Sequence, residues 1–248
     1  MNRLQNKVAI VTGANSGIGL RTAQLFAEEG AILVLCARRK EKLDEVAKAL
    51  RAQGSQVLSI AADVSREEDC VRVVEEAVKA FGRVDVLVNN AGMADKHRPI
   101  TRCDGDWWHT VIDVNQNSVY YMMKAALKYM ELAGYGSIVN IASIGATRYN
   151  SGVAYTASKT AVIGMSKNVA IQFAGKGIRV NAVAPGFTFS EMTRAIPEPI
   201  IEQMVKKIPM KRGAEPREIA SAILFLASED ASFVNGQTLA VNGGMYLY

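Results

Sequence analysis

A tyrosine and a lysine four residues apart form the clearest candidate for a reactive pair. They are Tyr155 and Lys159, and Ser143 lies twelve residues before the tyrosine. Residues i and i+4 share one face of an α-helix, so both side chains are expected to point into the same space. A phenol has a pKa of about 10, and a fixed cation nearby favours its ionised form and lowers that value. The three residues therefore predict a proton-transfer site, although the same spacing also occurs on ordinary solvated helix faces.

A glycine-rich turn near the N-terminus has the composition of a phosphate-binding loop. It follows an apolar run and spans residues 12–19, with the spacing Gly-x-x-x-Gly-x-Gly. Glycines let backbone N–H groups and the start of the next helix approach a pyrophosphate. The spacing differs from the Gly-x-Gly-x-x-Gly fingerprint, but its place between a strand and a helix favours a dinucleotide site over a plain tight turn. The candidate residues are Gly13, Asn15, Ser16, Gly17, Ile18 and Gly19.

Two arginines indicate which dinucleotide this is. Arg38 and Arg39 follow Ala37, near the place where an NAD site usually has an acidic residue for the ribose 2′-hydroxyl. Ala37 offers no carboxylate, and a guanidinium suits a 2′-phosphate. We therefore expect NADP(H) as the cofactor. The alternative is that both arginines are simply the solvated start of a helix.

Two further turns are expected to border the nucleotide. Asp63 and Val64 follow the third strand, where an adenine ring would lie against the sheet edge, and residues 89–92 read Asn-Asn-Ala-Gly after the fourth. Small residues such as Ala91 and Gly92, beside Asn90, let the backbone come close to a ribose. Ordinary turns are the alternative at both places. In particular, a capping box between residues 65 and 68 would leave the aspartate as a turn residue.

Short β-branched runs alternate with amphipathic stretches from end to end, and these elements must position the turns. The expected strands are Val8–Thr12, Ala31–Cys36, Gln56–Ala61, Val84–Asn89, Ser137–Ala142, Ile178–Ala184 and Gln237–Val241. The expected helices are Ile18–Glu29, Glu41–Ala52, Arg66–Phe81, Trp107–Ala133, Ala154–Ala174 and Pro216–Ala227. Such alternation is typical of right-handed βαβ crossovers. It predicts an α/β, doubly wound parallel sheet (a Rossmann fold) of seven strands with helices on both faces.

The series runs without a repeat, a low-complexity tract or a linker, so residues 1–248 are expected to form one domain. The weakest pattern lies in residues 186–213, which contain Pro197, Pro199 and Pro209. A long irregular insertion in a regular fold is usually a lid or a binding loop. We expect a substrate-binding lid there, and a flexible surface excursion is the alternative.

The composition narrows the functional classes. A chain of 248 residues, 49% hydrophobic and 21% charged, can bury a full core. The cysteines and histidines lack metal-ligand spacing, so we expect reduced thiols and no metal site. The net charge of +5 comes mostly from scattered residues, which favours small acidic ligands over nucleic acid. Because the first apolar run is too short for a signal peptide or a membrane span, we expect a cytoplasmic protein without a membrane partner.

Together these motifs resemble the short-chain dehydrogenase/reductase family over nearly the whole chain. The matching positions are Thr12-Gly13-x-x-x-Gly17-Ile18-Gly19, Asp63, Asn89-Asn90-Ala91-Gly92, Asn115, Ser143, Tyr155-x-x-x-Lys159 and Pro185-Gly186. The resemblance implies that Tyr155 is the general acid in reduction and the base in oxidation, and that Ser143 hydrogen-bonds the substrate oxygen. It also implies that Lys159 binds the nicotinamide ribose and tunes the tyrosine. Asn115 would hold a water that links the lysine to solvent.

The loop after the sixth expected strand departs from the family pattern. Relatives often read Pro-Gly-x-x-x-Thr, whereas this chain continues from Pro185 and Gly186 through Thr188 to Ser190. A hydroxyl is kept for the nicotinamide carboxamide. Whether Thr188 or Ser190 makes that contact stays open.

The sequence segments that bear on the substrate point to different enzymes. Residues 225–228 and 241–246 are similar to those of 3-oxoacyl-carrier-protein reductases. Residues 131–136, basic in those enzymes for docking an acidic carrier protein, begin with Glu131 here, and the loop 93–99 also differs. We therefore expect a reductase of free ketones or secondary alcohols, with the carrier-protein reductase as the alternative.

An apolar pocket is expected around Ser143, suited to a hydrophobic or cyclic carbonyl compound such as a hydroxysteroid. Its candidate residues, each of which could also be ordinary packing, are Ile144, Tyr149, Val153, Phe187 and Met192.

The resemblance also implies an assembly and leaves one rival from another class. Members of the family usually pair two long helices across two-fold axes, so a homotetramer is expected. The rival is a nucleotide-sensing regulator that keeps the fold without the chemistry. Such a protein would be expected to lose Tyr155, Lys159 or Ser143, and this chain keeps all three.

Overall fold

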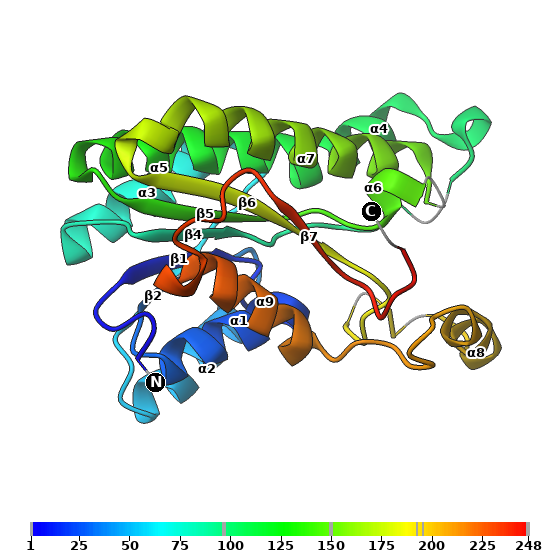
Figure 1. Cartoon of the computed structure of the whole chain (residues 1–248), viewed down its shortest axis with the longest axis horizontal. Coiled ribbons are helices and arrows are strands. Elements are labelled where there is room, and N and C mark those ends of the chain that lie inside the picture. The colour runs from blue at the N-terminus through cyan, green and yellow to red at the C-terminus, as the bar shows by residue number, and fades with distance from the viewer. Residues whose placement is uncertain (1, 96–97, 149–150, 192, 195, 247–248) are drawn as a thin grey trace.

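Seven parallel strands form one sheet in the order β3-β2-β1-β4-β5-β6-β7 in the computed structural model of the chain (Figure 1). The structure describes residues 2–95, 98–148, 151–191, 193–194 and 196–246. The strands are β1 (Val8–Thr12), β2 (Ile32–Ala37), β3 (Val57–Ala61), β4 (Val86–Asn89), β5 (Gly136–Ile141), β6 (Ile178–Pro185) and β7 (Thr238–Val241). The predicted doubly wound, seven-stranded sheet is confirmed, with every strand end within two residues of its expected place.

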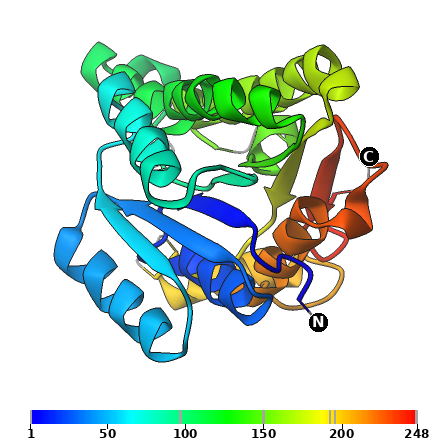
Figure 2. The ribbon, with the colours of Figure 1, turned by 90° about the vertical axis from the view of Figure 1, so that its left-hand side faces the viewer.

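Helices cover both faces of the sheet (Figures 1 and 2). One face carries α1 (Gly17–Glu28), α2 (Lys40–Ala52) and α9 (Pro216–Ala227). The other carries α3 (Glu67–Phe81), α4 (Gly105–Ile112), α5 (Ser118–Ala133) and α7 (Val153–Phe173). Two short helices, α6 (Gly145–Arg148) and α8 (Glu198–Lys206), were not expected from the sequence.

The two faces of the sheet hold separate hydrophobic cores. Along β1, Val8 and Ile10 join the core that includes α3, α5 and α7, whereas Ala9 and Val11 join the core of α1, α2 and α9. Successive residues of a strand point to opposite faces, so a sheet covered on both sides needs strands that are apolar throughout. In the described part of the chain, no helix is long and apolar enough to cross a membrane.

The predicted helix over Trp107–Ala133 is helical throughout, but it is not α-helical throughout. The segment consists of α4, a π-helical turn at Asp113–Asn117, and α5. A π turn contains one more residue than an α turn and often marks a functional site. Asn115, at its centre, is fully buried.

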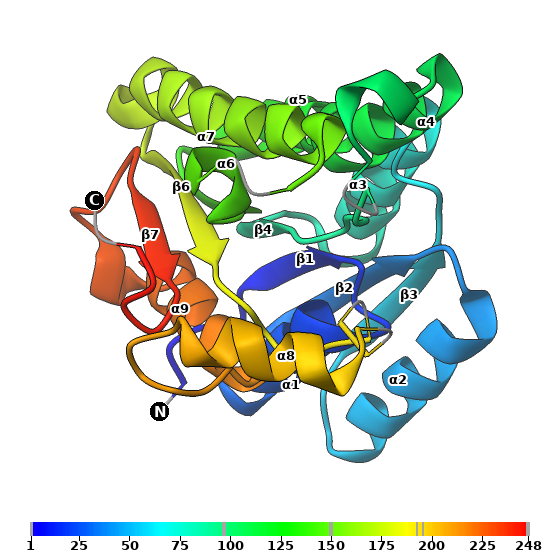
Figure 3. The same cartoon turned by 90° about the vertical axis from the view of Figure 1, so that its right-hand side faces the viewer.

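Two local expectations also differ from the structure. Residues 186–213 are not wholly irregular, because α8 follows Pro197, with a second proline in its first turn. Figures 1 and 3 show α8 at the periphery, beyond the carboxyl ends of the strands, and none of its residues is buried. The capping box at residues 65 and 68 does not form, since the Ser65 hydroxyl donates to Asp63 Oδ1 (2.8 Å) instead.

Candidate active site

A cleft opens at the carboxyl ends of β1 and β4, where the winding of the sheet changes direction. Ligands of open α/β sheets bind at such a switch point. The volume of the cleft is about 510 Å³. Its wall includes all but one of the predicted cofactor residues, namely Gly13, Asn15, Ser16, Gly17, Ile18, Arg38, Arg39, Asp63, Val64, Asn90, Ala91, Gly92, Tyr155, Lys159, Pro185, Gly186, Thr188 and Ser190. The exception is Gly19, which is buried.

Glycines let the turn after β1 pack closely on the loop after β4. Gly13 has a φ of +66°, and a Cβ there would lie 2.8 Å from Asn90 Nδ2. A Cβ at Gly19 would lie 2.3 Å from the Gly13 carbonyl oxygen. The two segments are also tied by hydrogen bonds, because Thr12 Oγ1 accepts from the amides of Asn90 (2.9 Å) and Ala91 (3.0 Å). Together they form one fixed floor of the cleft.

The start of α1 faces this floor and suits an anion. Ser16 is the N-cap residue, but its side chain makes no capping hydrogen bond, and the first turn contains no acidic residue. The N–H groups of the first turn and the positive end of the helix dipole therefore favour a phosphate. The glycine turn and this helix start fit the pyrophosphate of a dinucleotide.

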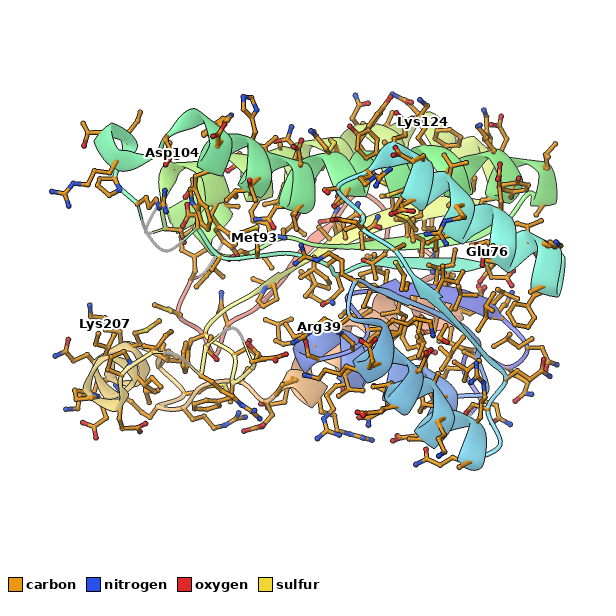
Figure 4. All side chains as sticks on the ribbon, turned by 180° about the vertical axis from the view of Figure 1, so that it is seen from behind. Arg39, Glu76, Met93, Asp104, Lys124 and Lys207 are labelled. Carbon is orange, nitrogen blue, oxygen red and sulfur yellow. The ribbon has the colours of Figure 1, made fainter. Side chains whose placement is uncertain are left out.

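The two arginines of the predicted 2′-phosphate site have different surroundings. Arg39, at the start of α2 in Figure 4, pairs with both carboxylate oxygens of Glu191 (3.0 and 2.9 Å), and Lys42 contacts the same carboxylate (3.2 Å). Hydrogen bonds from Arg39, Lys42 and Ser16 lower the pKa of Glu191 to about 2. Arg38 also lines the cleft, but it pairs with no carboxylate among the described residues. Arg38 is thus the arginine that is free to meet an added anion.

The residues predicted to do chemistry meet at the other end of the cleft. Tyr155 and Lys159 project from α7, and Ser143 follows β5. Lys159 is only 4% exposed, and its Nζ donates to the Ile141 carbonyl oxygen (2.7 Å). The same Nζ lies 5.9 Å from the centroid of the Tyr155 ring. The Ser143 hydroxyl accepts from the Gly145 amide (3.0 Å). A phenol, a hydroxyl and an ammonium therefore share one enclosed space.

Burial controls the proton affinity of this group. Burial raises the pKa of Tyr155, a hydrogen bond with Ser143 lowers it, and the charge of Asp95 raises it. Burial also lowers the pKa of Lys159 to about 8. The predicted lowering of the phenol's pKa by the lysine was therefore wrong. The largest cause is loss of hydration, which penalises the phenolate, and Lys159 does not contribute to the shift.

Asn115 braces the loop that follows β4. Its Oδ1 accepts from the Met93 amide (2.8 Å), and its Nδ2 donates to the Met93 carbonyl oxygen (2.9 Å). Figure 4 labels Met93 on this loop. The neighbouring Gly92 allows the loop to pass close to the lysine, because a Cβ there would lie 3.2 Å from Asn115 Oδ1 and 3.5 Å from Lys159 Nζ.

The predicted substrate residues are only partly brought together. Ser143 and Phe187 lie on the cleft wall. Ile144 is buried and Val153 is half-buried at the start of α7, and neither is part of that wall. The remaining two, Tyr149 and Met192, lie outside the described residues.

The residues of the cleft wall that sequence reasoning missed include Met93, Val114 and Glu191. Each directly precedes or follows a position that was singled out, and that adjacency is the one signal that pointed to them. Within the described ranges, no cluster of three His, Cys, Asp or Glu residues has the arrangement of metal ligands.

Comparison with known proteins places this geometry in a family. Residues 13–246 match the profile described as enoyl-(acyl carrier protein) reductase. The chain is 41% identical over 246 residues to 3-oxoacyl-[acyl-carrier-protein] reductase FabG of Thermotoga maritima, covering 99% of this chain and 100% of the relative. It is 42% identical over 239 residues to cis-4-hydroxycyclohexanecarboxylate dehydrogenase of Sinomonas cyclohexanicum, covering 96% of both chains.

A solved structure agrees with these relatives. The crystal structure of levodione reductase superimposes with a TM-score of 0.92 at 34% identity, covering 97% of this chain and 98% of that one. The chain therefore belongs to the short-chain dehydrogenase/reductase family and is an oxidoreductase that acts on carbonyl or alcohol groups, with a nicotinamide cofactor.

Proposed function

We propose that the chain interconverts a hydrophobic or cyclic ketone and its secondary alcohol, with NADP(H) as the cofactor. The observation that carries this proposal is the meeting of Tyr155, Ser143 and Lys159 at one end of the cleft whose other end holds the glycine turn and Arg38. The cofactor supplies the hydride when it is bound. The protein's own residues must then orient the substrate and move one proton.

Each residue of the group has a proposed role. Tyr155 donates a proton to the substrate oxygen in reduction and accepts it in oxidation, and Ser143 hydrogen-bonds that oxygen. Lys159 holds the nicotinamide ribose. Asn115 fixes the Met93 backbone beside the lysine, and its family role of holding a water is proposed along with this.

The preference for NADP(H) is proposed from the charges at the adenosine end. Arg38 lines the cleft without a carboxylate partner among the described residues. The residues at the end of β2 and directly after it, Ala37 to Arg39, include no acidic residue. A guanidinium there favours a 2′-phosphate and gives the 2′-hydroxyl of NAD no acceptor.

The substrate class is proposed from the apolar part of the wall and from the relatives. Phe187, Met93 and Val114 line the cleft on the lid, the loop after β4 and the π turn. Two of the relatives are named for cyclic compounds, a hydroxycyclohexanecarboxylate and levodione. We propose residues 186–213 as the lid over this end, since α8 buries none of its side chains and so has few contacts to hold it in place.

A 3-oxoacyl-carrier-protein reductase is the second candidate, because FabG is among the relatives that match nearly the full chain. The surface at residue 131 argues against it. Glu131 pairs with Lys176 there, so the site where a basic patch would dock an acidic carrier offers little net positive charge.

The test follows NADPH oxidation with a panel of cyclic ketones, steroid ketones and 3-oxoacyl thioesters, comparing the wild type with Tyr155→Phe. We expect turnover of a cyclic or steroid ketone, and a loss of about 10²- to 10⁴-fold in Tyr155→Phe with NADPH binding unchanged. Tyr129→Phe, at a half-buried phenol outside the cleft, is the control. Preference for a carrier thioester would favour the second candidate. NADPH binding without any turnover would favour the sensing regulator.

A further inference from the structure

The helix that carries Tyr155 lacks a side chain at its cap. The N-cap residue of α7 is Gly152, which makes no side-chain hydrogen bond. The first N–H groups of a helix have no partner within the helix, and the N-cap side chain normally accepts from the second or third of them. In α7, the third of these amides belongs to Tyr155 itself.

A carboxylate from another segment takes the place of the missing cap. Asp95, on the loop after β4, is 3% exposed, and its Oδ2 accepts from the Tyr155 amide at 2.9 Å. The glycine at the cap position makes room for it, because a Cβ on Gly152 would lie 2.2 Å from Asp95 Oδ2. A negative charge at this end of a helix is also favourable for the helix dipole.

The loop that carries Asp95 is itself held at two points. Asn115 clamps the amide and carbonyl groups of Met93, two residues before Asp95. Trp107, near the start of α4, donates its Nε1–H to the Asp95 carbonyl oxygen (3.3 Å). The loop therefore forms a fixed link between the π turn and the first turn of α7.

We infer that Asp95 is a positioning residue for Tyr155: its buried carboxylate caps α7 in place of a side chain at Gly152 and so fixes where the phenol stands in the cleft. The inference rests on the proposed acid–base role of Tyr155.

The charge of Asp95 has a second consequence. Among the described residues, the titratable and charged groups around the phenol are Asp95 from the loop after β4 and Lys159 from the same helix, with the neutral Ser143 hydroxyl after β5. The negative charge of Asp95 raises the pKa of Tyr155. Removing this charge alone should favour the phenolate and move its titration to lower pH.

Two substitutions separate the cap from the charge. Asp95→Asn keeps an oxygen that can accept from the Tyr155 amide but removes the charge, whereas Asp95→Ala removes both. Asp85→Asn is the matched control, because Asp85 is a buried aspartate that accepts from the Val8 amide (2.9 Å) at the amino end of the strands, away from the reactive residues.

The measurements are the pH profile of alcohol oxidation and, independent of turnover, the ultraviolet titration of the phenol taken as the difference between each protein and its Tyr155→Phe derivative. For Asp95→Asn we expect both midpoints to move to lower pH, with kcat close to that of the wild type at the new optimum. For Asp95→Ala we expect a fall in kcat of about 10- to 100-fold with NADPH affinity unchanged, because the phenol is misplaced while the nucleotide end is intact. Asp85→Asn should match the wild type in both titrations.

Unshifted titrations in Asp95→Asn, or wild-type kcat in Asp95→Ala, would overturn the inference. If Asp95→Ala does not fold, the titration of Asp95→Asn still decides the matter. Failure of the proposed function has a different signature, since Tyr155→Phe would then retain activity whatever the Asp95 variants do.

Discussion

Lys159 illustrates the cost of placing a reactive group in a protein interior. Its ammonium is 4% exposed and donates to the Ile141 carbonyl oxygen, while burial lowers its pKa from 10.5 to about 8. Between these two pH values the unfolded chain binds a proton that the folded chain lacks. Stability therefore rises with pH across this window, and below pH 8 the charged lysine makes the folded state less stable.

This argument predicts the behaviour of Lys159→Met. The shift corresponds to roughly 3 kcal/mol of stability gained by the wild type between pH 8 and 10.5, and the variant should lack this gain. Urea unfolding of both proteins at several pH values in this range measures it. Lys167→Met, at an exposed lysine on the same helix, should follow the wild-type curve. Parallel curves for the wild type and Lys159→Met would contradict the prediction.

Arg38 gives a second prediction at the scale of a residue. Arg38→Asp should weaken NADPH binding by about 10- to 100-fold and change NADH binding far less, because charge-assisted hydrogen bonds contribute about 1.5–3 kcal/mol. Fluorescence titration with both nucleotides measures the two affinities. Arg66→Asp, at an exposed arginine paired with Glu68, is the control for the change in net charge. An equal loss of affinity for both nucleotides would contradict the assignment of Arg38 to the 2′-phosphate.

The residues of the site differ in how far local sequence could reveal them. The i, i+4 spacing correctly placed Tyr155 and Lys159 on one helix, because helix geometry is local. Asp95 and Glu191 were not found, because their contacts join segments 60 and about 150 residues apart in the chain. The pKa of the phenol was also beyond reach, since burial depends on the complete fold.

At the scale of elements, the π turn at Asp113–Asn117 shows what a periodic pattern conceals. Apolar residues run through Trp107–Ala133 at helical spacing, so the sequence predicts one helix there. The extra residue of the π turn coincides with Asn115, whose amide group pairs with both backbone groups of Met93. These tertiary hydrogen bonds occur at the π turn. The helical propensities of its residues contain no information about them.

This pairing predicts the effect of Asn115→Ala. The two Met93 groups would lose their partners in a partly buried place, so we expect a loss of about 2 kcal/mol in unfolding free energy together with reduced turnover. Asn117→Ala, in the same π turn but bonded to Asp113, is the matched control and should cost less. Thermal and urea unfolding measure both changes. Equal losses in the two variants would show that the turn itself, not the Met93 clamp, carries the stability.

For the whole molecule, the sheet and its two helical layers were predictable because both follow from the alternation of strands and helices. The helices α5 and α7 also leave large apolar side chains uncovered. Leu132 at the end of α5 and Ile171 near the end of α7 are 86% and 81% exposed. The two helices lie side by side in Figures 1 and 3, and Lys176 pairs with Glu131 where they end. Exposed apolar groups that form one contiguous patch mark subunit contacts, whereas isolated ones belong to the ordinary surface.

We therefore predict that this face joins copies of the chain, as the proposed homotetramer requires. The double substitution Leu132→Glu with Ile171→Glu would bury charges in a two-fold interface, where each residue meets its symmetry-related copies. Sedimentation velocity should then report a smaller assembly than the wild type, with circular dichroism unchanged. Ile100→Glu, at a residue 73% exposed on the short turn Ile100–Arg102, is the control and should keep the wild-type mass. A wild type that is monomeric, or a double variant of unchanged mass, would assign the exposed leucine and isoleucine to the ordinary surface.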